Sequence, residues 1–377
     1  MSNHTQSILF VSTRPSLGHG MITRAENKTT VFQASYEIVS SMVPVFIFIA
    51  VVAILGNLMV VFLFVKNRTW LKKAHSNLIL AMAVSDILTA VCILSVPRFV
   101  LENNVYSVSE NFIARELYCR IVWSHYVVFS LGVTSVYTCL SLAVERWLAI
   151  AKPVFYKQHI HTRRNITLMV LLPWLAGFTF EASALIRTSG VVYPDGSADC
   201  RWNPDTSEWP ARVAIAVVSF LGMIMIPGFL VVLTYVRILI KIKGTIKRRN
   251  SQERRHSRSK TDFKRITGMA GVASVTLIIC WLPGQFYFML GQMDYVTLDV
   301  IEHRWLNVLM LSSACLNPFI YAFWNPNYRE GFKNELAWLV CWKRSGKAYS
   351  LTSQSKDNSC AMVGRRSGEQ SPPPTEV

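Results

Sequence analysis

The sequence is poor in charged residues. They make up 16% of the 377 residues, whereas hydrophobic residues make up 51%; a typical soluble domain has roughly 25% charged residues. This composition excludes a disordered chain and argues against an ordinary cytosolic enzyme. The net charge of +17 would suggest nucleic-acid binding if the basic residues formed a patch. They flank long apolar stretches instead, so we expect no nucleic-acid partner.

Lysine and arginine are missing altogether from seven stretches of at least 21 residues. A helix needs about 20 apolar residues to cross the hydrocarbon core of a bilayer. The stretches do not alternate as the strands of a membrane barrel would. The sequence therefore predicts an all-α membrane protein, a bundle of seven transmembrane helices. The predicted spans are Met42–Val65, Asn77–Pro97, Ile121–Val144, Asn165–Ile186, Val213–Val236, Ile266–Met293 and Trp305–Tyr328.

The basic residues are distributed unevenly between the two ends of these spans. The first tail and the segments after spans 2, 4 and 6 hold ten of the 39 Lys and Arg residues, and the rest lie in or next to the other segments. Cytoplasmic loops carry the basic excess, so we expect a plasma-membrane protein with its N-terminus outside and its C-terminus cytoplasmic. Asn3 and Asn27 stand in glycosylation patterns on the outer side. The predicted parts are an extracellular tail over 1–37, a membrane domain over 38–340 and a disordered cytoplasmic tail over 341–377.

Cysteines on the outer side are scarce. Of eight cysteines, Cys119 and Cys200 fall in outer segments, where a disulfide can persist. They permit a single bridge that ties the top of span 3 to the loop after span 4. Cys341, just past the last span, is a candidate palmitoylation site, although chance placement explains it nearly as well.

Polar residues are rare inside the spans, and each is a candidate functional residue because polar groups are costly in hydrocarbon. Asp86 lies midway along span 2, and oxygen-bearing side chains from other spans can converge on it. Such a group would hold a sodium ion or ordered water, with no other cofactor expected; an aspartate hydrogen-bonded between helices is the alternative. The candidate sodium residues are Asp86, Asn57, Ser135, Ser313 and Asn317.

Several short motifs, one set per span, together resemble the rhodopsin-like (class A) G-protein-coupled receptors. They are Gly56-Asn57, Leu80–Asp86, Cys119, Glu145-Arg146-Trp147, Trp174, Pro227 with Tyr235, Cys280-Trp281-Leu282-Pro283 and Asn317-Pro318-Phe319-Ile320-Tyr321. The resemblance covers about residues 38–340. Asn327–Leu339 looks like the family's short amphipathic helix on the inner membrane surface.

The resemblance implies a receptor that activates heterotrimeric G proteins and carries out no covalent catalysis. Arg146 would meet the G protein, next to Glu145. Tyr235, Asn317, Pro318 and Tyr321 would stabilise the active inner cavity, and Trp281 would be the pivot beneath the ligand. From the residues alone, Glu145-Arg146 is equally compatible with a structural ion pair or an anchor at the lipid headgroups.

Two departures from the family pattern stand out. Cys119 lies 27 positions before Arg146, about two more than is common, which leaves the outer half of span 3 without a fixed alignment. Many members have an acid 18 positions before the tryptophan pivot; here that residue is Phe263. Without that acid to hold Arg146, we expect appreciable basal signalling.

The residues that define two ligand classes are missing. Amine receptors need an aspartate in span 3, where this chain has Val128 or Tyr126, depending on the alignment; opsins need a lysine in span 7, where Leu311 stands. The outer loops carry an excess of acids, which favours a basic, neuropeptide-like ligand; solvated loop charge explains the acids equally well. The expected ligand contacts are Glu181, Trp281, Gln285, Phe288, Trp305 and Asn307.

Other functions remain as alternatives. A lipid or small molecule is the second choice of ligand. A transporter or channel is disfavoured because the spans show no two-half repeat, and an enzyme because no catalytic set appears at usable spacing.

The sequences of the predicted cytoplasmic loop and tail indicate further partners. Lys241–Arg265 is strongly basic, and we expect it to extend spans 5 and 6 as helices that meet anionic lipid or G protein. The hydroxyl-rich tail would be phosphorylated by receptor kinases and bind arrestin, as the resemblance implies. Thr375-Glu376-Val377 resembles a ligand of PDZ proteins, a pattern that is also common by chance.

Overall fold

The computed structural model describes residues 19–97, 99–101, 106–160, 162–202, 208–249, 257–298 and 300–348, without the side chains of 19–41, 245–249, 257–263 and 338–348. The chain divides between Val45 and Phe46 into two units, and the described part of the first unit is helical. Asn3 and Thr375–Val377 lie outside the described residues, as do the side chains of Asn27, Phe263 and Cys341.

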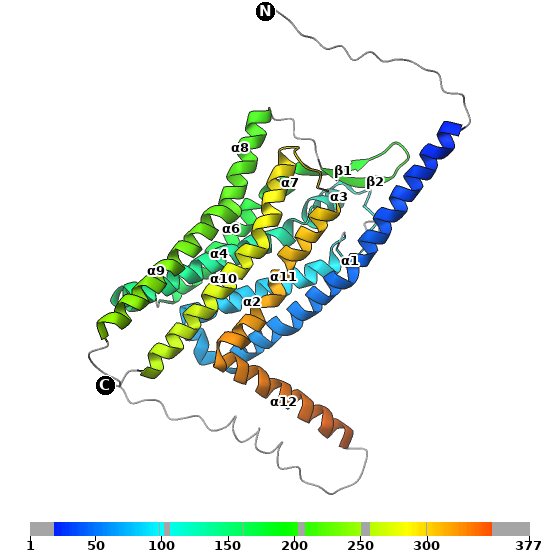
Figure 1. Ribbon diagram of the computed structural model, residues 1–377. Coiled ribbons are helices and arrows are strands. Elements are labelled where there is room, and N and C mark those ends of the chain that lie inside the picture. The colour runs from blue at the N-terminus through cyan, green and yellow to red at the C-terminus, as the bar shows by residue number, and fades with distance from the viewer. Residues whose placement is uncertain are drawn as a thin grey trace, which may run out of the picture. The chain divides into compact units, whose positions relative to one another are not determined.

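Seven helical runs in the described residues are long and apolar enough to cross a membrane. They are α1 (His19–Lys66), α2 (Ala74–Ser95), α4 (Tyr126–Ala151), α6 (Arg163–Phe180) with α7 (Ala182–Arg187), α8 (Trp209–Phe220) with η4 (Leu221–Met225) and α9 (Ile226–Arg249), α10 (Ser257–Gln292), and α11 (Ile301–Trp324). In the second unit, these helices lie side by side and α12 (Pro326–Ala348) turns away from them (Figure 1). We call the end of the bundle that carries α12 the inner end and the opposite end the outer end. The prediction of an all-α bundle with seven spans is confirmed.

Several helix ends differ from the predicted limits. α1 begins at His19, within the residues assigned to the first tail, and α12 continues to Ala348, past the expected end at 339. The seventh span ends at Trp324 rather than at 328, because Asn325 precedes a proline and has an extended backbone with φ −119° and ψ 112°. The predicted helical extensions of spans 5 and 6 are confirmed, since α9 reaches Arg249 and α10 starts at Ser257.

The third span was predicted between one and two turns too early, at 121–144. α4 runs from Tyr126 to Ala151 and carries Arg146 inside it. Before it come α3 (Phe112–Leu117) and a π-helix, η2 (Tyr118–Trp123). His125 then adopts a left-handed backbone with φ 60° and ψ 19°, which residues other than glycine rarely adopt. These two features accommodate the extra residues between Cys119 and Arg146, because a π-turn takes up one more residue than an α-turn.

Because α4 is uninterrupted, it also decides between the two alignments of the third span, one counted from Cys119 and the other from Arg146. Tyr126 and Arg146 belong to one continuous helix, so counting outward from Arg146 is the correct alignment. Val128, which is fully buried, therefore stands where amine receptors have their aspartate.

The outer end carries a hairpin that the sequence analysis did not predict. β1 (Thr188–Val192) pairs antiparallel with β2 (Ala198–Trp202), with Gly190 opposite Cys200. The connecting turn contains Pro194-Asp195-Gly196, and Gly196 has φ 84°. Proline, aspartate and glycine in this order are a typical turn sequence, so this signal was present in the sequence.

Short segments connect the spans at the inner end. A 3-10 helix, η1 (Arg68–Lys72), leads into α2, and α5 (Pro153–Phe155) with the π-helix η3 (Tyr156–Ile160) lies between α4 and α6. Lys66 Nζ forms an ion pair with Glu335 at 2.7 Å, which fastens α12 to the inner end of α1.

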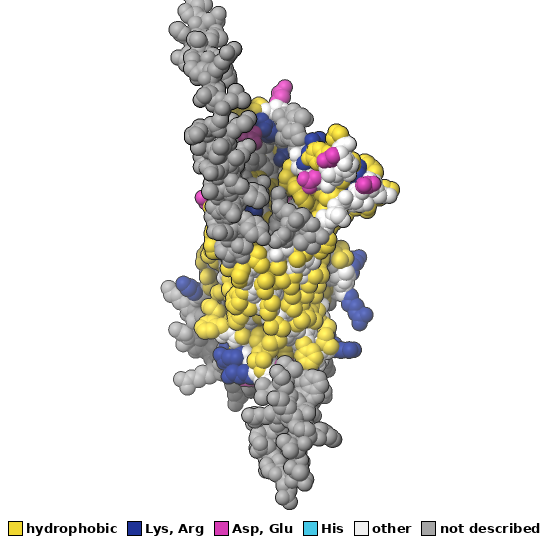
Figure 2. Space-filling model, turned by 90° about the vertical axis from the view of Figure 1, so that its right-hand side faces the viewer, with side chains coloured by type: hydrophobic (Ala, Val, Ile, Leu, Met, Phe, Trp, Pro, Cys, Tyr) yellow, Lys and Arg dark blue, Asp and Glu magenta, His cyan; other side chains and the backbone are white. Residues whose placement is uncertain are grey.

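Apolar side chains occupy both the interior and the outer surface of the bundle. The interior cluster draws on α2, α4, α9, α10 and α11, with members such as Leu78, Val136, Val231, Leu277 and Tyr321. Figure 2 shows a broad apolar belt on one face, with Lys and Arg at its lower edge and Asp and Glu, together with further Lys and Arg, above it. An apolar surface of this extent is expected where lipid, rather than water, surrounds the helices.

Candidate functional site

A buried carboxylate lies in the middle of the bundle. Asp86 on α2 is 4% exposed, and its Oδ2 accepts a hydrogen bond of 2.8 Å from Asn317 Nδ2 on α11. Asp86, Ser135 and Ser313 line a cavity of about 10 Å³, which is the space that one water-sized species needs. Oxygen atoms from α2, α4 and α11 therefore converge on one small cavity.

Asn57 lies beside this cavity and not in its lining. Its Nδ2 donates to the backbone oxygens of Ala53 and of Ala314, which does line the cavity. Asn57 Oδ1 is buried and has no hydrogen-bond partner among the described residues. The predicted group thus comes together around Asp86, with Asn57 one layer further out. No cluster of three or more His, Cys, Asp or Glu able to hold a metal ion occurs in the described part of the chain.

Trp281 forms the outer wall of the same cavity. Its side chain is 2% exposed, and its Nε1–H donates to Ser313 Oγ at 3.1 Å. The indole ring lies directly against Gly132 of α4, where a Cβ atom would overlap the ring carbons Cη2 and Cζ2. A glycine is required at this position because only a residue without a side chain leaves room for the ring.

Five of the six predicted ligand contacts are buried or half-buried, and Trp305 is the exception. Trp281, Gln285 and Phe288 follow one another at helical spacing on one face of α10. Gln285 is 5% exposed. Asn307 on α11 is half-buried, and its Oδ1 atom is buried without a hydrogen-bond partner among the described residues.

Glu181 is a buried acid without a partner. It lies between α6 and α7 and is 7% exposed. Among the described residues, no side chain or backbone group forms a hydrogen bond or ion pair with its carboxylate. Nearby, Arg212 pairs with Asp294, and His125 Nε2 lies 3.0 Å from the Pro97 oxygen.

Trp305 lies on a different face of its helix. Its side chain is 53% exposed, and it stands nine positions, or two and a half turns, before the buried residue Ala314. Trp305 therefore points away from the interior of the bundle, and its position gives no support to the predicted ligand contact.

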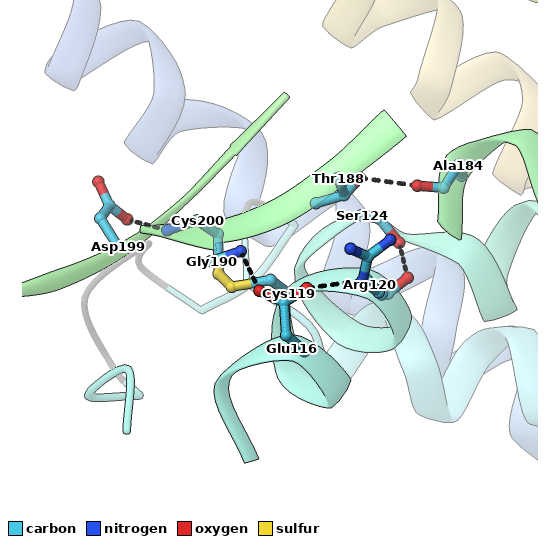
Figure 3. Close-up of a disulfide and its surroundings, with 9 residues drawn as sticks. All are labelled: Glu116, Cys119, Arg120, Ser124, Ala184, Thr188, Gly190, Asp199 and Cys200. Atoms are coloured by element: carbon cyan, nitrogen blue, oxygen red, sulfur yellow. Dashed lines mark hydrogen bonds and ion pairs between the residues drawn. A yellow bond between two sulfur atoms is a disulfide. The ribbon is translucent and has the colours of Figure 1, made fainter. Parts of the chain in front are cut away.

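Two links fasten the hairpin to α3 and η2, just before the third span (Figure 3), and a third joins η2 to α7, which leads into β1. The predicted disulfide between Cys119 and Cys200 is present, with the two Cα atoms 5.3 Å apart. Gly190 N–H donates to Glu116 Oε1 at 3.0 Å, and Arg120 donates to the Leu185 oxygen and pairs with Glu116. Burial alone would raise the pKa of Glu116, but these hydrogen bonds and the nearby positive charges lower it below its ordinary value.

At the inner end, three buried side chains and the half-buried Tyr156 form a cluster that we call the inner ionic cluster: His75, Glu145, Arg146 and Tyr156. Glu145 is fully buried and accepts two hydrogen bonds from Arg146. Tyr156 Oη donates to the same carboxylate at 2.5 Å. Burial and the charge of Glu145 raise the pKa of Tyr156 above its ordinary value, so its hydroxyl stays protonated and remains a donor.

The other predicted switch residues lie near this cluster or beneath the cavity. Tyr235 on α9 is 8% exposed and packs next to Gly271. Tyr321 on α11 is 1% exposed, and its hydroxyl lies 3.3 Å from Met82 Sδ. Pro318 lies so close to Gly56 of α1 that a Cβ atom there would be 2.8 Å from the proline ring.

Comparison with known protein families matches residues 56–321 to the 7 transmembrane receptor (rhodopsin family). The chain belongs to this family. It is therefore a rhodopsin-like G-protein-coupled receptor and a multi-pass membrane protein, as its motifs and its seven spans predicted.

Individual relatives are distant but cover most of the chain. Galanin receptor 2a of Danio rerio is 23% identical over 320 residues, which are 82% of this chain and 82% of the relative. The allatostatin-A receptor of Bombyx mori is 25% identical over 79% of this chain and 80% of its own length. A Gq-coupled rhodopsin of Mizuhopecten yessoensis is 25% identical over 78% of this chain and 58% of its own length.

The receptor contains further residues at these sites that the sequence analysis did not single out. Gly132 contacts Trp281, His75 and Tyr156 join the inner ionic cluster, and Glu116 holds the hairpin. A glycine inside an apolar span signals a close approach, so Gly132 had a sequence signal. His75 and Tyr156 had none, because their role depends on which helices meet.

Proposed function

We propose that this receptor binds a basic peptide at its outer end and activates heterotrimeric G proteins at its inner end. The observation that carries the ligand class is Glu181, a buried carboxylate without a partner among the described residues. An unpaired buried charge is costly, and a cationic group of the ligand would pair with it. The buried Oδ1 of Asn307, also without a hydrogen-bond partner there, would accept a second hydrogen bond from the ligand.

The relatives and the charges of the outer end support the same class. Two relatives are named as receptors for galanin and allatostatin-A, which favours a peptide. Asp195 and Asp199 on the hairpin are exposed, and acids gather at this end in Figure 2. A negative rim attracts a cationic ligand over about a Debye length, roughly 8–10 Å. In the opsins a lysine binds the chromophore at the place of Leu311, which is 1% exposed and has no amine.

The proposed orientation places the outer end outside the cell and the inner end in the cytoplasm of a plasma-membrane receptor. The excess of Lys and Arg in the segments after spans 1, 3, 5 and 7 supports this orientation. Arg146 would engage the G protein after leaving the inner ionic cluster. Receptor kinases, arrestin and a PDZ protein are the partners we propose for the tail.

We expect Glu181→Gln to weaken activation by a cationic peptide at least about tenfold, roughly 1.4 kcal/mol. The amide keeps the size of the side chain and removes its charge. Agonists would first be found by screening a peptide library for GDP release from purified G proteins. Agonist concentration–response curves then check the prediction, with Glu208→Gln, an exposed acid, as the matched control. Equal potency of both variants would exclude a pairing role for Glu181.

We also propose that the cavity at Asp86 holds a sodium ion. Carboxylate, hydroxyl and amide oxygens suit a hard cation, and Asn57 Oδ1 supplies a buried acceptor without a partner among the described residues. Asp86, Ser135 and Ser313, which line the cavity, would contact the ion, and Asn317 and Asn57 would support this group from just outside the lining. The charge of the ion would stabilise the ionised carboxylate.

Sodium is expected to raise the thermal unfolding midpoint of the purified receptor above its value in choline chloride at equal ionic strength. A ligand that binds only the folded state stabilises it by mass action. Asp86→Asn should remove this difference, because the amide carries no charge to pair with the ion. If sodium and choline give the same midpoint in the unmodified receptor, the cavity holds no sodium.

A further inference from the structure

Arg146 has a partner from outside its own helix. Its Nη2 atom lies 2.9 Å from Nδ1 of His75, the second residue of α2. His75 is 9% exposed and Arg146 is 2% exposed, so the contact is largely screened from water. His75 Nδ1 is also 3.9 Å from Glu145 Oε1. The imidazole therefore stands next to both members of the Glu145–Arg146 pair.

The chemistry of the two groups fixes the protonation state of His75 in this arrangement. A guanidinium has five N–H donors and no acceptor, so Arg146 donates and His75 Nδ1 accepts. The ring must then be neutral, with its proton on Nε2. A protonated ring would point an N–H group at the guanidinium and would place two positive charges at hydrogen-bond distance.

We propose that neutral His75 is a positioning residue that holds Arg146 in its resting place, and that protonation of His75 releases Arg146 toward the G protein. Protonated His75 would lose its hydrogen bond from Arg146 and would compete with Arg146 for Glu145, whose oxygen is already 3.9 Å away. The inference rests on the G-protein contact of Arg146 proposed above. In this receptor, His75 would restrain Arg146 in place of the acid that many family members have at the position of Phe263.

The surroundings of His75 contain charges of both signs. From α4 and η3, Glu145, Arg146 and Tyr156 share its cluster. Lys72 and Lys73 precede it in the chain, and the N-terminus of α2 carries a partial positive charge. Of the other helices packed on α2, α6 starts with Arg163 and Arg164, and α11 has Tyr321 near its inner end. The positive groups favour the neutral ring, whereas Glu145 favours its protonation.

The test measures basal GDP release from purified heterotrimeric G proteins by the full-length receptor in nanodiscs, without ligand, between pH 7.5 and 5.5. Histidine side chains ordinarily titrate near about pH 6.5. Release above the rate of G protein alone should rise as the pH falls, and this increase should reverse when the pH is raised. We expect a change of about tenfold, as for the loss of one hydrogen bond to a charged group.

Three variants distinguish a positioning role of His75 from a purely structural role. His75→Asn keeps an acceptor for Arg146 without titrating, so its basal release at pH 7.5 should stay within about twofold of the unmodified receptor and should lose the pH dependence. His75→Lys carries a permanent charge and should raise basal release about tenfold at all pH values. His159→Asn is the matched control, since His159 is an exposed histidine of η3 and its replacement should leave the profile unchanged.

Two outcomes would overturn the inference. The first is a pH profile of His75→Asn that equals that of the unmodified receptor, which would assign the titration to Glu145 or to the G protein. The second is basal release by His75→Lys at the unmodified level, with an unchanged amount of folded receptor. If no G protein releases GDP under any condition, with or without peptides, the proposed function itself fails, which is a distinguishable result.

Discussion

Replacing Gly132 by alanine is expected to displace Trp281 and to destabilise the resting receptor by about 1–3 kcal/mol, the usual cost of overpacking. The new Cβ would overlap two carbons of the indole ring. The ring is 2% exposed, and the cavity that it lines, about 10 Å³, is too small to take up the displaced ring. Either α4 and α10 move apart, or the ring turns and breaks its 3.1 Å hydrogen bond to Ser313, which adds about 1 kcal/mol.

Two measurements check this prediction. The thermal unfolding midpoint should fall, and basal GDP release should rise because the tryptophan leaves its resting position. Gly228→Ala is the matched control, because the nearest atom to a Cβ there is Ile278 Cγ2 at an ordinary 3.5 Å. Gly132→Ala and Gly228→Ala with equal midpoints and equal basal release would contradict the prediction.

A double-mutant cycle assigns the effect to the contact itself. Trp281→Phe removes the ring atoms that meet the new Cβ, so Gly132→Ala should cost less in that background than in the unmodified receptor. Residues in contact typically couple by about 0.5–3 kcal/mol. Additive effects would show that alanine acts elsewhere in α4.

The seven spans were predictable because lipid imposes a composition that is visible along the chain. The predicted ends of the spans were wrong where a charged residue is buried in an ion pair. The third span was ended at Val144 because Glu145 and Arg146 follow, whereas α4 continues to Ala151 with both charges buried. Sequence counting cannot tell a charge that ends a helix from one that is neutralised inside the protein.

The candidate sites were predictable to the extent that family motifs mark them. Asp86 and Asn317, far apart in sequence but placed in one candidate group by the sequence analysis, are hydrogen-bonded to each other. The contact of Gly132 with Trp281 and that of His75 with Arg146 join different helices and belong to no quoted motif. Trp305 and Asn307 show a further reason why site residues could not all be predicted. They are two residues apart, and only the rotation of α11 about its axis decides which of them faces the interior.

Removal of the disulfide by Cys119→Ser with Cys200→Ser is expected to cost about 2–5 kcal/mol, as for native disulfides in general. The bridge joins residues 81 positions apart and holds β2 at the outer end of the third span. Peptide potency should fall more than tenfold because the hairpin that covers the outer end loses its attachment. Cys92→Ser, at a free and half-buried cysteine of α2, is the matched control.

The two contacts that remain without the disulfide predict how the loss of peptide potency depends on Glu116. Glu116 accepts from Gly190 N–H, and Arg120 donates to the Leu185 oxygen, so β1 stays fastened in the reduced receptor and basal GDP release should persist. Glu116→Ala should then cost more peptide potency without the disulfide than with it, because the Gly190 contact becomes a principal remaining attachment. Equal costs in the two backgrounds would mean that the hairpin is held independently of Glu116, and an unchanged potency of the double serine variant would mean that the hairpin does not contact the peptide at all.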